Sequence, residues 1–302
     1  MHKFLFSLCL ILGACAKPIE HPNQTGQLHN SNIKEASGLA RSNIDASRLW
    51  VMNDGGADPV LYAIGLDGSD LGAFRVSGAD NNDWEDLSSF VIDDRPMLLI
   101  ADFGDNLGLR EYLTLYLLDE PEVSEISAGE TTKLEIAWQI EFAFPGGATD
   151  AESVSVDVAN EMVLILSKRE IPAVLYRVPL RGSAGKSGTI VTATRVGPVA
   201  SLPQPSKRDR DRALAHLDWH WQPTAMDISA RADSAAILTY RGLYFFKRAE
   251  NQSWYDAFQS SPRSITSDAF EKAESVTFSA DGSVVFVTTE HTNAPLLRFD
   301  VE

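Results

Sequence analysis

The feature of this chain that most constrains its fold is an internal repeat. Five segments of the 302-residue sequence share a small or acidic lead-in followed by one apolar anchor residue, and the anchors stand 48, 67, 74 and 48 residues apart. A fixed period of this kind indicates that each repeat is one supersecondary unit, with the longer intervals holding insertions. The anchors are Leu39, Leu87, Val154, Ile228 and Val276.

Each repeat continues with two further apolar runs. The first begins at Leu49, Leu98, Val163, Ala236 and Val285. The second is marked by Leu61-Tyr62, Leu115-Tyr116, Leu175-Tyr176, Leu243-Tyr244 and Leu296-Leu297. Short apolar runs separated by turn residues predict strands that are buried on both faces. The sequence therefore predicts an all-β fold, a single β-propeller of five blades.

The remaining strands and the closure of the ring are less strongly patterned. The fourth strands are expected at 73–76, 134–142, 190–196 and 254–258, with a short helix within 206–221. Because the fifth repeat ends with the chain, Leu28 to Ile33 is expected to close the last blade as an N-terminal strand. Six blades, or a two-domain β-sandwich, are the alternatives.

The N-terminus resembles an export signal. Phe4 to Leu12 is almost wholly apolar and follows Lys3; it rises about 14 Å as a helix, roughly half a bilayer core, which is typical of a signal peptide and too short for a span. Cys15 follows small residues, as in the bacterial lipobox, and Cys9 leaves with the signal. We predict a signal peptide at 1–14, a lipid anchor at Cys15 with a spacer through 26, and the propeller at 27–302. Secretory cleavage after Ala14 or Ala16 is the alternative.

The net charge and the residue after Cys15 limit the partners and the cell compartment that we expect. The formal net charge of −16 disfavours nucleic acid. By lipoprotein sorting rules, the absence of Asp after Cys15 favours the periplasmic side of an outer membrane. We expect a monomer that touches the membrane through its lipid alone and binds an unidentified small molecule or protein.

Acidic residues recur on the predicted first strands, where alternate side chains face the axis. Four residues before the anchors stand Glu35, Asp83, Asp150, Thr224 and Lys272; two residues before them stand Ser37, Glu85, Glu152, Met226 and Glu274. Six carboxylates around one axis require a compensating cation, hydrogen bonds or protonation. Oxygen ligands without cysteine favour Ca²⁺.

A second polar set, which includes Asp54, Asp102, Asp105, Asn106 and Glu290, follows the predicted second strands. From the two sets together we predict metal ligands at Asp83, Glu85, Asp102, Asp105, Asn106, Asp150, Glu152 and Glu274. Ligand-binding positions are predicted at Glu35, Asp54, Lys168, Arg241 and Glu290. The alternative for the loop acids is that they cap turns and accept backbone hydrogen bonds.

Several of these segments together resemble a known family. They are 82–87, 101–106 with Arg110, 150–152, 167–168, 227–229 and 273–276. They are similar to exported bacterial β-propeller lipoproteins of the phytase-like and SdiA-regulated groups, with Phe103 and Met226 departing from the pattern. The resemblance implies a propeller in the cell envelope. It leaves two functions open: a tethered propeller that binds a ligand or partner at an acidic, calcium-holding mouth, or a metal-dependent hydrolase of phosphoesters or lactones.

Overall fold

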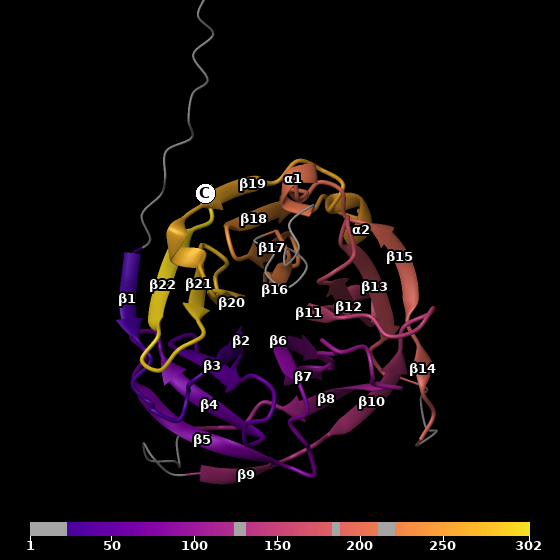
Figure 1. The fold of residues 1–302 in the computed structure, drawn as a ribbon. Helices are drawn as coiled ribbons and strands as arrows, with labels where there is room; N and C mark the ends of the chain where they lie inside the picture. The colour runs from indigo at the N-terminus through magenta and orange to yellow at the C-terminus, as the bar shows by residue number, and fades with distance from the viewer. Residues whose placement is uncertain (1–22, 124–130, 183–187, 211–220) are drawn as a thin grey trace, which may run out of the picture.

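The chain forms a ring of five β-sheets around one axis (Figure 1). The computed structural model describes residues 23–123, 131–182, 188–210 and 221–302. The innermost strand of each sheet contacts the innermost strands of both neighbouring sheets, so that the ring is continuous. The protein is therefore a five-bladed β-propeller, which confirms the predicted fold class.

The blades follow one another along the chain. Blade 1 contains β2 (Ala36–Arg41), β3 (Arg48–Asn53), β4 (Val60–Gly65), β5 (Asp70–Ser77) and β9 (Thr131–Glu135). Blade 2 contains β6 (Trp84–Ile92), β7 (Arg95–Asp102), β8 (Leu113–Asp119), β10 (Trp138–Ala143) and β14 (Val191–Thr192). Blade 3 contains β11 (Ala151–Asp157), β12 (Met162–Ser167), β13 (Val174–Pro179) and β15 (Thr194–Pro198). Blade 4 contains β16 (Pro223–Ile228), β17 (Ser234–Thr239), β18 (Gly242–Lys247) and β19 (Arg263–Thr266). Blade 5 contains β20 (Ala273–Phe278), β21 (Val284–Thr289), β22 (Pro295–Asp300) and β1 (Asn23–Gln27).

Helical structure among the described residues is short. The α-helices are α1 (Lys207–Arg210), which lies inside the predicted helical segment, and α2 (Trp254–Ala257); two 3₁₀ turns span Val158–Asn160 and Asp268–Phe270. Of the described segments, none forms a helix that is long and apolar enough to cross a membrane.

The hydrophobic core lies between the blades. Each of the five interfaces holds one apolar cluster, represented by Trp84, Phe142, Phe246, Phe278 and Leu28. The Leu-Tyr repeat supplies these clusters because adjacent strand residues face opposite sides of a sheet. In blade 2, for example, Leu115 packs toward blade 3 and Tyr116 toward blade 1.

An N-terminal strand closes the ring, but at a different place from the predicted one. The strand is β1, which pairs antiparallel with β22 on the outside of blade 5. Leu28 and Ile33 are instead fully buried between blades 5 and 1. The prediction followed apolar residues, whereas an edge strand faces water on the outside and can be polar, as the sequence of β1 is. The first strand among the described residues therefore begins at Asn23, within the predicted spacer.

Three other expectations about strands need correction. The segment 190–196, predicted as one strand, is divided between β14 in blade 2 and β15 in blade 3. The segment 254–258 is helical: the Ser253 hydroxyl caps α2 by accepting the Asp256 N–H, and Trp254 packs in the core. The fourth strand of blade 4 is β19. The segment 134–142 divides between two blades, because β9 joins blade 1 in parallel with β5 and β10 joins blade 2.

The predicted signal peptide at 1–14 and Cys15 lie outside the described residues.

Candidate functional site

A β-bulge interrupts the first strand of every blade at one equivalent position. The ladder shifts between Trp84 and Asp86 in β6, and at the matching places in β2, β11, β16 and β20. A bulge leaves one residue unpaired and redirects its side chain. The bulged residues are Ser37 and Gly38, Glu85, Glu152, Thr224 and Glu274.

This register corrects the alignment of the fourth repeat. Met226 pairs with Ile237 as Val276 pairs with Val287, so Met226, not Ile228, is the anchor of blade 4. Thr224 therefore occupies the position of Glu85, and Met226 does not interrupt the acidic column. The Thr224 hydroxyl donates to the Ala273 carbonyl, much as the Ser37 hydroxyl donates to the Glu85 carbonyl. Both hydroxyls join adjacent blades at the same end of the axis.

A second ring of side chains stands just past the second strands. The backbone N–H groups of Asp54, Lys168 and Glu290 donate to carbonyls that precede the first strands of the same blades, at 2.8–2.9 Å. The repeated hydrogen bond places the three side chains at the end of the axis where the bulges lie. We define the acidic mouth as Asp54, Asp83, Glu85, Glu274 and Glu290.

Three carboxylates converge within the acidic mouth. One oxygen each from Asp54, Asp83 and Glu85 lie within 4.8 Å of one another. Glu85 is only 3% exposed, and within the described chain its carboxylate forms no hydrogen bond. Burial costs its charged form hydration, and the nearby charge of Lys168, which already pairs with Glu152, offsets this cost only in part.

Glycine makes this convergence sterically feasible. A Cβ on Gly104 would lie 2.1 Å from Oε1 of Glu85 and 2.5 Å from Cγ of Asp83. A Cβ on Gly55 would lie 2.4 Å from Oδ1 of Asp83. Side chains at either position would displace the carboxylates, so the loops after β3 and β7 together shape the cluster.

The pKa values of the three carboxyl groups are displaced upward. Burial raises the pKa of Asp54 to about 7, and Glu274 and Asp83 add repulsion. Burial also raises the pKa of Asp83, opposed by Arg110. It raises the pKa of Glu85 well above its usual range, with a further contribution from Asp54. A divalent cation would relieve the same repulsion that protons relieve here.

The second half of the acidic mouth contains Glu274 and Glu290. The Tyr240 hydroxyl donates to the carboxylate of Glu274 and fixes it. Burial, followed by the charge of Glu274, raises the pKa of Glu290 to about 8. Burial and Glu274 likewise raise the pKa of Tyr240, which therefore remains a donor at neutral pH. Two neighbouring carboxyl groups are thus held where they share a proton or accept a cation.

Other predicted ligands already have partners. Asp102 is fully buried and binds Arg110 at 2.9 Å, while accepting the N–H of Asp83. Lys168 pairs with Glu152, although one oxygen of Glu152 has no hydrogen-bond partner. These contacts favour structural roles for the groups involved.

The remaining predicted ligands lie around the mouth. Arg169 binds both Asp150 and Asn106, and Asp105 accepts the backbone N–H groups of Leu109 and Arg110. Glu35 is exposed, and Arg241 lies over the Trp221 ring at 6.0 Å. The structure thus brings together Asp83 and Glu85 with Asp54, and Glu274 with Glu290. Tyr240 and Gly104 were not predicted; Tyr240 stands just past the second strand, as Lys168 and Glu290 do.

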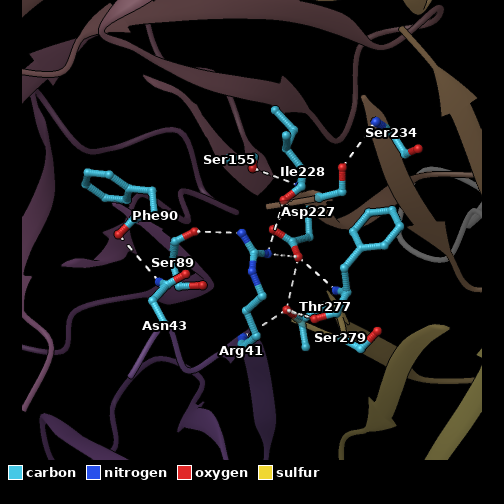
Figure 2. Close-up of polar contacts among 12 residues, drawn as sticks. Arg41, Asn43, Ser89, Phe90, Ser155, Asp227, Ile228, Ser234, Thr277 and Ser279 are labelled. Atoms are coloured by element: carbon cyan, nitrogen blue, oxygen red, sulfur yellow. Dashed lines mark hydrogen bonds and ion pairs between the residues drawn. The ribbon is translucent and has the colours of Figure 1, made fainter. Parts of the chain in front are cut away.

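Polar side chains fill the axis below the mouth. Asp86 is fully buried and accepts backbone N–H groups from Leu87, Val154 and Met226, the last two from blades 3 and 4. At the other end of β2, the Arg41 guanidinium binds Asp227 at 3.0 Å and the carbonyl of Ile228 at 3.1 Å (Figure 2). These contacts cross the axis, and they leave the acidic mouth as the end at which a ligand can approach the clustered carboxylates.

The acidic mouth predicts an unusual pH dependence of stability. In the unfolded chain Asp54 and Glu290 titrate near 3.8 and 4.5, whereas in the folded protein they titrate at about 7 and 8. Between these values the folded state binds more protons, so the free energy of unfolding falls as pH rises from about 4 to 8. We expect the thermal midpoint in chelator to be lower at pH 8 than at pH 5.

The matched variant for this measurement is Asp54→Asn/Glu290→Gln, in which the fall should be smaller. Asp281, whose pKa is lowered to about 2, acts below this window. A midpoint that rises steadily from pH 5 to pH 8 would contradict the assignment.

Similarity to known proteins is found among solved structures. No family model and no curated protein matches this chain. Among solved structures it is similar to the β-propeller domain of Cps50 (Swd1) from Myceliophteria thermophila, with a TM-score of 0.41 and 11% identity. The match covers 89% of this chain and 65% of that one.

Proposed function

We propose that this chain is a lipid-tethered, extracytoplasmic propeller that binds a ligand or partner at its acidic mouth through a Ca²⁺ ion. The observation that carries the proposal is the convergence of Asp54, Asp83 and Glu85 around a buried carboxylate that has no hydrogen bond within the described chain. A bound cation would compensate this charge, as Arg110 and Lys168 compensate Asp102 and Glu152.

The donor chemistry supports Ca²⁺ over other metals. All three converging groups are carboxylates, which are hard oxygen donors, and the cluster contains no histidine or thiol. Ca²⁺ accepts six to eight oxygens in loose geometry and completes its shell with carbonyls and water. Mg²⁺ requires near-ideal octahedral geometry at short distances and gives up its water reluctantly, so it is less suited to a site built from side-chain carboxylates of two blades.

Tethering is proposed from the sequence of the N-terminus. The lipobox-like residues before Cys15 and the absence of another cysteine from the mature chain support lipidation. Export would place the acidic mouth outside the cytoplasm, where free Ca²⁺ is more abundant than within it. Labelling with a radioactive fatty acid should mark the natural chain and spare Cys15→Ala; equal labelling of both would refute the tether.

Ligand binding is better supported than metal-dependent hydrolysis of phosphoesters or lactones. A phosphate-binding centre needs cationic donors for the substrate. Three cations at this end of the axis, Arg110, Lys168 and Arg169, are each already engaged with a carboxylate. The carboxylates of the mouth therefore exceed the cations available to attract an anionic substrate.

Calorimetric titration with CaCl₂ at pH 8 tests the cation site. We expect the mature chain to bind one Ca²⁺ and Glu85→Gln to bind it at least about tenfold more weakly, because one charged ligand becomes neutral. Glu250→Gln, which changes an exposed carboxylate elsewhere, should bind like the natural chain. Absence of binding, or equal affinity in all three proteins, would remove the metal from the proposal.

A further inference from the structure

The loop between β7 and β8 presents two leucines to solvent beside the acidic mouth. Leu107 is 81% exposed and Leu109 is 76% exposed. The loop contains Gly104, whose backbone lies against the carboxylates of Asp83 and Glu85. Exposed leucines are common on protein surfaces when scattered singly. Here two of them stand on one loop at the rim of the charged cluster.

Hydrogen bonds from both ends hold this loop in place. The carboxylate of Asp105 accepts the N–H of Leu109 at 2.8 Å, and the backbone carbonyl of the same residue accepts the N–H of Gly108 at 2.9 Å. The Arg110 guanidinium binds both Asp102 and the Gly104 carbonyl. The leucines are therefore held in solvent by a fixed backbone, which lowers the entropic cost of binding a partner there.

Further apolar side chains flank the same region. Tyr112, in the same loop, is 45% exposed, and Ile171, in the loop that follows β12 and Lys168, is 37% exposed. Apolar side chains therefore accompany the charged residues at this end of blades 2 and 3.

The charge of the mouth selects the partner. The mouth is built from five carboxyl groups, and the whole chain carries a formal net charge of −16. A partner with basic side chains would be attracted and oriented, whereas an anionic membrane surface would be repelled. Apolar side chains on the same partner would cover the leucines.

We infer that the acidic mouth and the loop with Leu107 and Leu109 together bind a polypeptide segment in which basic and apolar residues alternate. A basic side chain of the partner approaches the carboxylates, and its apolar neighbours pack on the two leucines. The inference extends the proposed function by naming the class of partner. The packing of the partner's apolar side chains on Leu107 and Leu109 does not depend on a bound cation.

Fluorescence anisotropy with a labelled ten-residue peptide of alternating lysine and leucine tests this inference. We expect saturable binding by the natural chain, and binding at least about tenfold weaker by Leu107→Ser/Leu109→Ser. The matched control is Ile44→Ser/Val91→Ser, which removes exposed apolar side chains at the other end of the first strands, and it should bind as the natural chain does. A peptide with glutamate in place of lysine should not bind.

Peptide binding unchanged in the leucine variant, or binding of the glutamate peptide, would overturn the inference. Binding to phosphatidylglycerol vesicles that depends on the same leucines, without binding of the lysine peptide, would assign the surface to a membrane and also overturn it. Calcium titration of the leucine variant separates the two proposals. If calcium binding persists while the peptide does not bind the natural chain, only this inference fails; if the peptide binds and calcium does not, only the cation site fails.

Discussion

Replacing Arg41 with methionine should lower the free energy of unfolding by about 3–5 kcal/mol, because it leaves a buried carboxylate without its cation. Asp227 is 2% exposed and accepts hydrogen bonds from Arg41, Thr277 and the Phe278 N–H (Figure 2). The guanidinium also reaches Ser89 in blade 2. One side chain thus links blades 1, 2 and 4, and chemical denaturation monitored by tryptophan fluorescence would measure its loss.

Two controls separate charge from packing. Arg95→Met breaks the exposed pair with Asp119, whose side chains are 52% and 57% exposed, and should cost less than about 1 kcal/mol. The double variant Arg41→Met/Asp227→Asn removes both buried charges and should recover much of the lost stability. If Arg41→Met cost no more than Arg95→Met, or if the double variant were as unstable as the single one, the buried charge would not be the cause.

The repeat could be recognised from sequence because the same physical demand acts on every blade. Each third strand must fill two interfaces, so a leucine and a tyrosine recur side by side, and Leu175 and Tyr176 indeed pack toward blades 4 and 2. Segments that do not have to fill two interfaces between blades were predicted at the wrong places or in the wrong conformation. The polar strand β1 faces water, and α2 occupies a segment whose apolar residues suit either a helix or a strand.

The acidic end of the axis was predictable, but the grouping of its carboxylates was not. Alternation along the first strands indicated inward-facing acids, and Glu85 and Glu274 do lie at the mouth. Whether a given acid meets a cation depends on the loops that follow the second strands, as when Arg169, in the loop after β12, reaches Asp150, which precedes the first strand of the same blade. No local spacing encodes such distances.

The contacts that cross the axis left no sequence signal. Arg41 and Asp227 are 186 residues apart, and although Asp227 lies in one of the family-like segments, nothing in that segment indicates its partner. The fourth repeat was misaligned by two residues because Met226 and Ile228 are both apolar and alternate residues of a strand lie on the same face, which concealed the equivalence of Thr224 and Glu85. Two apolar residues on one face of a strand cannot be told apart as anchors until the register with the partner strand is known.

Replacing Glu85 with glutamine should have opposite effects on stability and on calcium binding. In the absence of cations at pH 8, the variant should be more stable than the natural chain by about 1–3 kcal/mol, because glutamine avoids a buried charge without a partner. At pH 5 the difference should shrink, since the raised pKa of Glu85 makes its neutral form more populated as the pH falls. Thermal unfolding in chelator at both pH values would measure it.

Added calcium should reverse this order. At a free concentration 100 times the dissociation constant, a ligand that binds only the folded state stabilises it by about 2.7 kcal/mol, which the natural chain should gain and Glu85→Gln should largely lack. Glu250→Gln, with an exposed carboxylate removed, should follow the natural chain under every condition. A Glu85→Gln protein that is less stable than the natural chain in chelator at pH 8 would mean that the carboxylate has a structural partner. Equal stabilisation of both proteins by calcium would place the ion elsewhere.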